Sequence, residues 1–447
     1  MKQAPAKRLL AIAVSAALPG GAAAAEYILD AGTRVEYSNN ILLTPANEEH
    51  GWVGIVSSGF SMREDGPRLN TNLAASVEYQ DYRSDQFEDR TNFGLNGVAV
   101  WSISPEQLTW TAEDVFVQVL RDRASLDIPS NRENANTFST GPDAFLRLNP
   151  VNTLSVGARY ADYYFENIET GTGPTGDRDS TRVSGIARWI YRYTPRTTLS
   201  LNYSSERTDF DDPMNNENFR RRDAYFSLQT RTTQTGSGVN LDLGGTTIVR
   251  DRSAEVQGAL GRLSVHRQST PRSAYRLAAS AEYTDNARDL LTAGLTGGDP
   301  SLVSAPGQTD ILYAKQADAT YSGTSGFLGT VLRAYGRSEA YELAVLNDVK
   351  IAGGGVELSY KLTEALTGSL TGNWSKTDYQ NVDRIDILAS AGLGLVYRAR
   401  EPLTVSLTLT RNERVSDGAV AGQEYEEFRA ALGVSYRYQT PGSRNWE

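Results

Sequence analysis

Arginines recur on one face of the extended stretch 181–203, where they could bind anions. Arg182, Arg188 and Arg192 stand at even positions, and successive side chains of a β-strand point to opposite faces, so the three share a face. Other alternating segments carry polar residues on the corresponding face, namely Arg34, Arg68, Asn72, Glu78 and Arg159. If these faces line a channel, a basic wall attracts anionic sugars or other anions.

The competing interpretation is that each arginine pairs with an acidic residue on the same face and braces the wall. Acids at suitable positions are Glu36, Glu78, Glu113 and Glu206. Because inward acids are about as plentiful as inward arginines, we favour pairing.

Few residues could support catalysis or bind a metal. The chain has no cysteine, which excludes thiol nucleophiles and thiolate metal sites, and it has two histidines. His50 lies in a polar stretch, and His266 follows Ser264 on the same strand face; both fit solvated histidines better than catalytic ones. The acidic clusters 166–179 and 209–212 lack the spacing of a calcium loop. We therefore predict no enzyme, no metal site and no cofactor.

The arginine face requires a strand whose other face is apolar. Val183, Trp189 and Tyr193 alternate with the arginines, and a turn containing Pro195 leads into a second alternating run. A soluble sandwich would place the charged face outside, whereas a membrane barrel places it inside. The pattern predicts an all-β protein, a single transmembrane antiparallel β-barrel.

The start of the chain reads as a secretory signal. Residues 1–25 hold a basic start, an apolar run at 9–18 and three alanines before Glu26. Removing them removes three basic residues and no acidic ones, so the net charge falls from −10 to −13. An acidic chain argues against nucleic acid as a partner. We expect residues 26–447 to form one barrel in the outer membrane of a Gram-negative bacterium.

Short turns and longer polar connections alternate along the chain. The short turns fall at 63–67, 104–107, 149–152, 194–197, 232–238, 268–272, 322–326, 362–366 and 398–403. The longer polar stretches are 39–51, 121–136, 166–180, 206–220, 286–308 and 415–424. Outer-membrane barrels have short periplasmic turns and longer outer loops, so the order predicts about 20 strands (18 are possible) with both ends in the periplasm.

Aromatic residues mark the ends of the predicted strands. Those beside short turns form the expected periplasmic girdle: Trp101, Trp110, Trp189, Tyr193, Tyr360, Tyr397, Tyr436 and Tyr438. A second set, including Tyr37, Tyr79 and Trp374, precedes the long connections. Two belts one strand length apart are typical of membrane interfaces.

Short motifs carry a family resemblance. Gly433-x-x-Tyr436-x-Tyr438 resembles the C-terminal insertion signal of outer-membrane proteins, from which the tail 439–447 departs. The motifs at 37–43 (YSNNILL), 136–142 (NTFSTGP) and 383–386 (DRID) resemble the β-barrel porins encoded with bacterial exopolysaccharide and protein-sorting gene clusters. The resemblance implies an outer-membrane location and a role in polysaccharide secretion, and it implies no catalytic residues.

These observations lead to a functional hypothesis. We expect a porin-like channel associated with exopolysaccharide export, with the long stretch 286–308 as a candidate plug. Its expected partners are outer-membrane lipid, lipopolysaccharide, a polysaccharide and periplasmic export components. The alternative is a non-conducting barrel that acts as an adhesin or scaffold through acidic outer loops.

Overall fold

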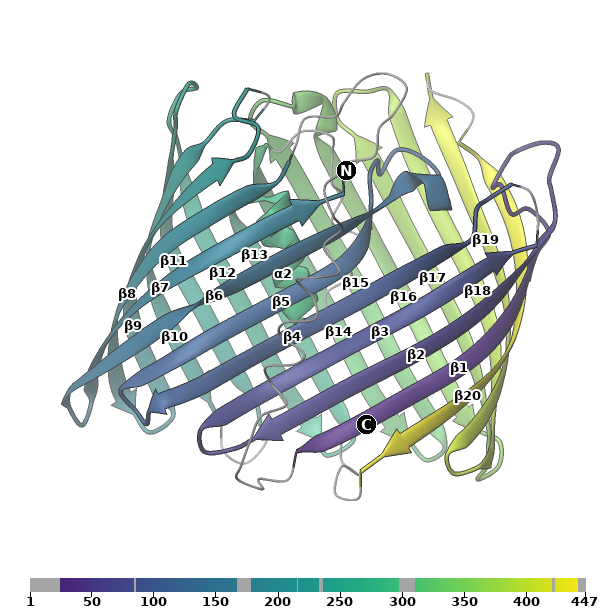
Figure 1. The fold of residues 1–447 in the computed structure, drawn as a ribbon, viewed down its shortest axis with the longest axis horizontal. Helices are drawn as coiled ribbons and strands as arrows, with labels where there is room; N and C mark the ends of the chain where they lie inside the picture. Colours follow the sequence, from purple (N-terminus) through teal and green to yellow (C-terminus); the bar gives the residue numbers. More distant parts are fainter. Residues whose placement is uncertain are drawn as a thin grey trace.

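Twenty strands form one closed antiparallel sheet in the computed structural model (Figure 1). Each strand pairs with its chain neighbours, and β1 pairs with β20 to close the barrel. The structure describes residues 25–83, 86–166, 178–214, 216–232, 236–296, 310–419 and 423–440. The predicted fold and strand number are confirmed.

The strands are longer than hydrocarbon crossing requires, since a tilted strand spans it in about 9–11 residues. Their bounds are β1 Glu26–Ser38, β2 Gly51–Asp65, β3 Leu69–Tyr82, β4 Arg90–Ser104, β5 Leu108–Leu120, β6 Arg132–Asn149, β7 Asn152–Phe165, β8 Ser180–Thr194, β9 Thr197–Phe210, β10 Phe219–Arg231, β11 Gly238–Arg250, β12 Val256–Thr270, β13 Ser273–Asp285, β14 Ile311–Ser325, β15 Leu328–Tyr341, β16 Val349–Lys361, β17 Leu366–Tyr379, β18 Arg384–Arg400, β19 Leu403–Gly418 and β20 Tyr425–Gln439.

The predicted asymmetry between short turns and long connections is present. Short turns join the strands at the end where β1 begins and β20 ends, and longer connections lie at the other end. Several predicted connections were too long: β6 begins inside 121–136, and β9 and β10 extend into 206–220. The reason is that polar residues on the inner face of a strand have the same composition as a loop.

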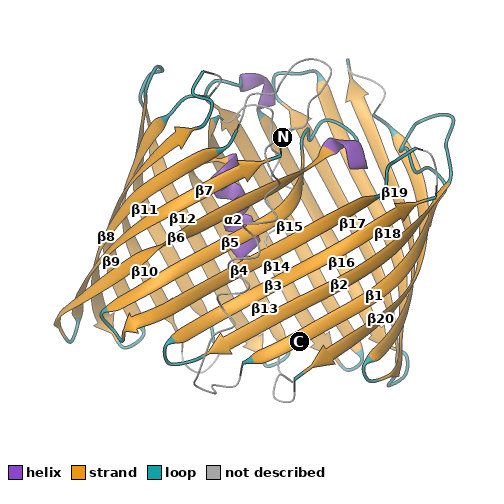
Figure 2. Cartoon of the chain, in the orientation of Figure 1, coloured by secondary structure: helices purple, strands orange, loops and turns teal. Residues whose placement is uncertain are grey.

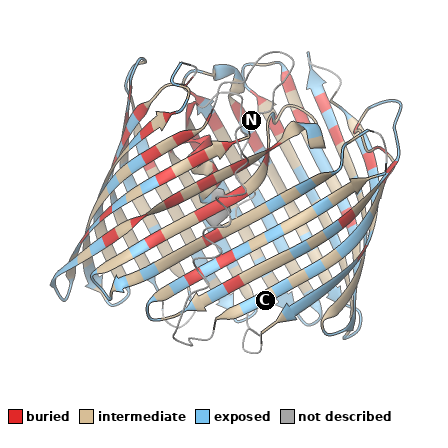
Figure 3. Cartoon of the chain, viewed as in Figure 1, coloured by how far each residue is buried: buried red, intermediate tan, exposed pale blue. Residues whose placement is uncertain are grey.

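The outer face of the sheet is apolar and exposed. On β8, Val183, Trp189 and Tyr193 are 61, 47 and 64% exposed, while Arg182 on the other face is 3% exposed. Pale-blue and tan positions accordingly alternate along much of the sheet (Figure 3). This alternation places charge inside and apolar side chains on the surface that lipid covers.

The glycine run 353–355 lies inside β16, and glycines inside a strand often mark a bulge or a close approach. The register of β16 with β15 and β17 is unbroken, so there is no bulge. A Cβ at Gly353 would lie 2.6 Å from the Tyr335 ring, so the run serves the close approach of a neighbouring side chain.

One helix longer than a single turn occurs among the described residues. The helix α2 (Asn286–Thr296) follows β13 and lies within the barrel (Figure 2). Within that part of the chain, no helix is long and apolar enough to cross a membrane.

Candidate functional site

The connection between β5 and β6, residues 121–131, crosses the lumen; we call it the crossing loop. Arg123 donates hydrogen bonds to both carboxylate oxygens of Glu339 on β15, at 2.9 and 3.2 Å. In a closed barrel of twenty strands, β15 is ten strands away from β5, on the opposite wall. A loop fixed at both places must divide the interior.

The crossing loop has a second attachment, on β19. Arg414 on β19 donates to the carbonyl oxygens of Ser125 and Ala124 at 3.0 and 2.9 Å. Asp386 on β18 fixes this arginine at 2.7 Å and also binds Arg384 at 2.9 Å. The loop backbone is thus held by charged groups that are themselves paired.

The helix α2 follows β13, two strands from the β15 anchor of the crossing loop, and packs against the other side of the barrel. Ala287 and Leu290 pack in one buried cluster with Val119 of β5, Ala135 of β6 and Tyr163 of β7. The apolar side of α2 therefore lies against the wall from which the crossing loop starts.

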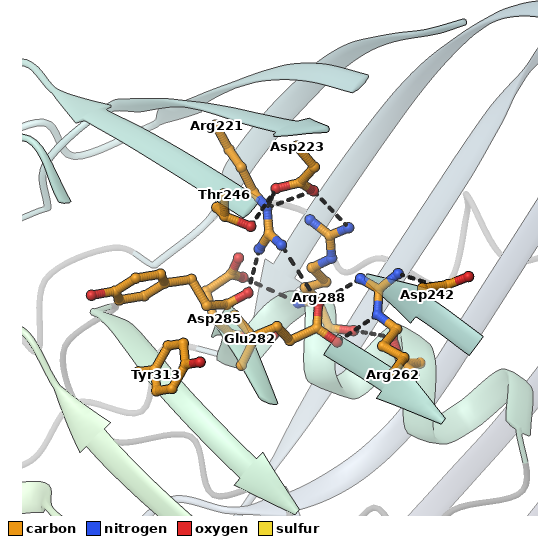
Figure 4. Close-up of polar contacts among 12 residues, drawn as sticks. Arg221, Asp223, Asp242, Thr246, Arg262, Glu282, Asp285, Arg288 and Tyr313 are labelled. Atoms are coloured by element: carbon orange, nitrogen blue, oxygen red, sulfur yellow. Dashed lines mark hydrogen bonds and ion pairs between the residues drawn. The ribbon is translucent and has the colours of Figure 1, made fainter. Parts of the chain in front are cut away.

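The polar side of α2 is held by charged wall residues (Figure 4). Arg288 approaches Asp223 of β10 at 3.8 Å, and its backbone N–H donates to Asp285 at 3.1 Å. Asp285 in turn accepts hydrogen bonds from Arg182 of β8, one of them at 3.0 Å. The beginning of α2 is therefore fixed to three strands.

Figure 4 also shows how this wall is built from alternating charges. Arg221 binds Asp223 at 2.9 Å and donates to the carbonyl oxygen of Tyr283 at 2.6 Å. On the neighbouring strands, Arg262 binds Glu282 at 2.7 Å. Such neutralised pairs brace a wet wall without leaving a single-sign field there.

The crossing loop and α2 share one anchor on β15. Arg337 binds Asp289 of α2 and also binds Glu339 at 2.5 Å. Glu339, whose side chain is 2% exposed, holds Arg123 of the crossing loop. The chain Asp289–Arg337–Glu339–Arg123, which we call the constriction network, joins the two segments that narrow the lumen.

Outside the strands, a carboxylate ties two outer connections together. Glu217 accepts hydrogen bonds from the Ser253 hydroxyl at 2.6 Å and from the backbone N–H groups of Arg252 and Ser253. Burial opposes the charge, but these hydrogen bonds outweigh it and hold the pKa of Glu217 below its usual range.

The predicted lumen residues fall into two groups, and all lie on the face opposite the exposed apolar side chains. Three arginines are ion-paired: Arg34 with Glu36 at 2.6 Å, Arg159 with Asp143, and Arg182 with Asp285 and, at 3.5 Å, with Glu206. Among the described residues no carboxylate lies within ion-pair distance of the other three, Arg68, Arg188 and Arg192. Asn72 and Glu78 lie on the inner face of β3, and Glu78 is 4.0 Å from Arg34.

The unpaired arginines lie toward the short-turn end. Arg188 and Arg192 occupy the second half of β8, and Arg68 directly precedes β3. Of the six predicted arginines, the three that are ion-paired therefore lie farther from the short turns than Arg68 and Arg192, which have no such partner among the described residues.

All eight predicted girdle residues are exposed on the outer face, each 42–64%. Trp101 and Trp110 are direct cross-strand partners, and Tyr397 lies opposite Leu366 at the start of β17. The girdle therefore lies beside the short turns, as the topology requires.

The remaining candidates are scattered. His50 lies before β2 near the Tyr37 ring, and His266 lies on β12 opposite Gly238, at the other end of the barrel. Asp209 binds Arg207 at 2.9 Å. In the described part of the chain no three acidic or histidine side chains are grouped to hold a metal ion; residues 1–24 and 167–177 lie outside it.

Sequence reasoning missed the constriction network. Arg123, Glu339 and Arg337 have no special local pattern, and the two ends of the Arg123–Glu339 pair are 216 residues apart. Of the acids we considered for pairing, Glu206 and Glu36 do bind arginines, but Asp285 is the stronger partner of Arg182.

Comparison with known proteins agrees with this architecture. The model of the family "Putative beta-barrel porin 2" matches residues 351–438, which fall in β16 to β20. Over these strands the chain is similar to this family of β-barrel porins. No curated protein matches the sequence.

Several solved structures resemble this barrel at low identity. The ferric enterobactin receptor of Pseudomonas aeruginosa is 12% identical, with 94% of this chain and 81% of that chain covered and a TM-score of 0.45. The FrpB iron transporter of Neisseria meningitidis is 12% identical over 92% and 81%, with a TM-score of 0.44. OccK2 of Pseudomonas aeruginosa, in complex with glucuronate, is 11% identical over 95% and 100%, with a TM-score of 0.41.

Proposed function

We propose that the barrel is an outer-membrane channel for anionic polar solutes, closed at rest by the crossing loop and α2. The observation that carries the proposal is the constriction network. It fastens two lumen segments to β15 through side-chain ion pairs and not through backbone pairing. Twenty strands enclose a lumen too wide for wall side chains to fill. Segments that narrow it therefore control what passes.

The charge distribution supports an anionic solute. Arg188 and Arg192 lie on the inner face below the constriction, and charged pore walls tune ion selectivity. Acidic sugars are solutes of this kind, and we place the channel beside an exopolysaccharide export system with periplasmic partners. The predicted signal at residues 1–25 would deliver the protein to the outer membrane.

Planar-bilayer recording of the refolded protein tests the proposal. We expect brief conductance steps and a reversal potential on the anion side under a salt gradient. A variant with Leu290→Asp, which places a charge in the apolar contact between α2 and the wall, should conduct more. Absence of conductance in both proteins would overturn the proposal and favour the adhesin or scaffold alternative.

A further inference from the structure

The wall of the barrel has an unpaired seam between β4 and β5. Their ladder begins at the short-turn end and stops at the pair Leu95–Phe116. Beyond it, residues 90–94 remain paired with β3 and residues 117–120 with β6, but the two sets share no backbone pairing. The sheet is therefore open along this edge in its extracellular half.

The seam lies at the depth of lipid. Trp101 of the periplasmic girdle and the exposed Tyr79, which is paired with Thr91, mark the two interfaces on β4. Residues 91–101 match the roughly 9–11 residues with which a tilted strand crosses the hydrocarbon. Phe93, 51% exposed, therefore stands within the outer leaflet.

Unpaired strand edges do not face hydrocarbon; at membrane depth they are buried in protein or line a water-filled cavity. A cavity of about 450 Å³ is lined by Phe93 and Gly94 of β4 together with Val117 and Gln118 of β5. Another cavity, of about 490 Å³, lies elsewhere in the barrel and does not touch the seam. The cavity at the seam also reaches Val53 and Ile55 on the inner face of β2. It thus connects the seam with the lumen.

A second seam shows how this barrel closes such an edge. The β12–β13 ladder stops at Gly261–Ala281, but the rings of Tyr283 and Tyr313 pack together beside it, 5.0 Å apart. Tyr313 also donates to the carbonyl oxygen of Ala259 at 3.2 Å, and a Cβ at Gly258 would lie 2.6 Å from the Tyr283 ring. Aromatic rings fill that seam.

The β4–β5 seam has no such filling among the described residues. Gln118 donates to Asn92 at 3.3 Å, and Arg90 donates to the carbonyl oxygen of Pro129 at 3.0 Å. Both contacts are made by long polar side chains at the rim. Below them the seam is flanked by two apolar side chains, Phe93 on the outer face of β4 and Val117 on the inner face of β5.

The rim also offers a binding group for a charged head. Arg90 donates to Asn92 and Pro129 but has no carboxylate within ion-pair distance in the described part of the chain. A cation above an apolar slot matches a molecule with one acyl chain and an anionic head.

We propose that the β4–β5 seam is a lateral portal through which a single-chain anionic amphiphile passes between the outer leaflet and the lumen. The acyl chain passes Phe93 on the outer face and Val117 on the inner face, and the head group binds Arg90. This route is separate from the axial path through the constriction network.

Cross-linking the seam tests the portal. The chain has no cysteine, so Asn92→Cys with Gln118→Cys introduces the only thiols, which dibromobimane can join. The matched control, Gln118→Cys with Asn134→Cys, joins residues already paired across the intact β5–β6 ladder. The probe is diazirine-bearing palmitic acid in lipid nanodiscs, with labelled peptides identified by mass spectrometry.

We expect label at Val53 and Ile55 in the uncross-linked protein and in the control, and its loss in the seam cross-link, while label on the outer face at Leu393 persists. Lumen label that survives seam cross-linking, or that is absent from all variants, overturns the portal. Arg90→Gln should reduce lumen label from palmitic acid but not from a diazirine-bearing fatty alcohol; equal reduction overturns the head-group assignment. Ion conductance should be unchanged by the seam cross-link. Failure of the portal proposal can therefore be distinguished from failure of the proposed axial channel.

Discussion

Glu339→Gln is the sharpest test of the constriction network. The substitution keeps the shape of a side chain that is 2% exposed but removes the charge that binds Arg123 and Arg337. Breaking a buried ion pair on one side costs about 3–5 kcal/mol. Each 1.4 kcal/mol is about tenfold in an equilibrium, so the population of the released state should rise by about two to three and a half orders of magnitude.

The crossing loop keeps its second attachment in this variant. Arg414 still donates to two loop carbonyl oxygens, and hydrogen bonds from charged groups contribute about 1.5–3 kcal/mol each. The closed arrangement should therefore remain the major one, and the expected result is frequent brief openings rather than a permanently larger pore. Adding Arg414→Ala should convert the openings into a sustained higher conductance.

Single-channel recording in planar bilayers measures both effects. The matched control is Glu357→Gln, the same change on the inner face of the neighbouring strand β16, where the described residues show no ion pair. The constriction network does not hold the channel closed if both Glu339→Gln and the double variant show the same conductance record as the unaltered protein, or if Glu357→Gln produces the same openings.

Three further predictions concern the wall, the lipid face and the outer connections. Arg188→Glu with Arg192→Glu should move the reversal potential toward cation selectivity under a salt gradient, and an unchanged potential would show that these side chains do not face the conducting path. Leu393→Arg places a charge midway between Tyr397 and the level of the outer aromatic residues. It should lower the free energy of unfolding by about 2–4 kcal/mol, measured by unfolding titrations from lipid bilayers. A loss below about 1 kcal/mol would contradict the assigned depth. Because the pKa of Glu217 is lowered in the folded protein, its contact with the 251–255 connection should persist through the ordinary glutamate range and be lost only as pH falls through that lowered pKa. Hydrogen exchange at the backbone amides of that connection measures the loss, and early loss at higher pH would count against the assignment.

The barrel could be predicted from sequence because its pattern is local. On β8 the alternation of arginines with Val183 and Trp189 indicates which face is in contact with water, and the same alternation repeats strand by strand. The ion-pair partners could not be predicted in this way. Arg182 and Asp285 lie 103 residues apart, and their meeting depends on how β13 leads into α2.

The positions of the two lumen segments could be predicted from the sequence only in part. The stretch 286–308 was expected as a plug, and its first part is α2 inside the barrel, while residues 297–309 lie outside the described part of the chain. The crossing loop was expected as an ordinary outer connection. Its course depends on the distance to the opposite wall, which is a property of the closed barrel and not of any segment.

The way the lumen is narrowed argues for a gate rather than a fixed filter. A fixed narrowing could be built into the sheet by backbone pairing, whereas here the crossing loop and α2 are both joined to β15 through Arg337 and Glu339. Buried ion pairs add little net stability, because desolvation offsets most of the Coulomb attraction, yet they specify one arrangement. A solute carboxylate that competes for Arg337 or Arg123 would replace one partner of the network with another at small net cost. Since both segments share these two arginines, such a solute would release them together, and opening would depend on the anionic chemistry that we propose for the cargo.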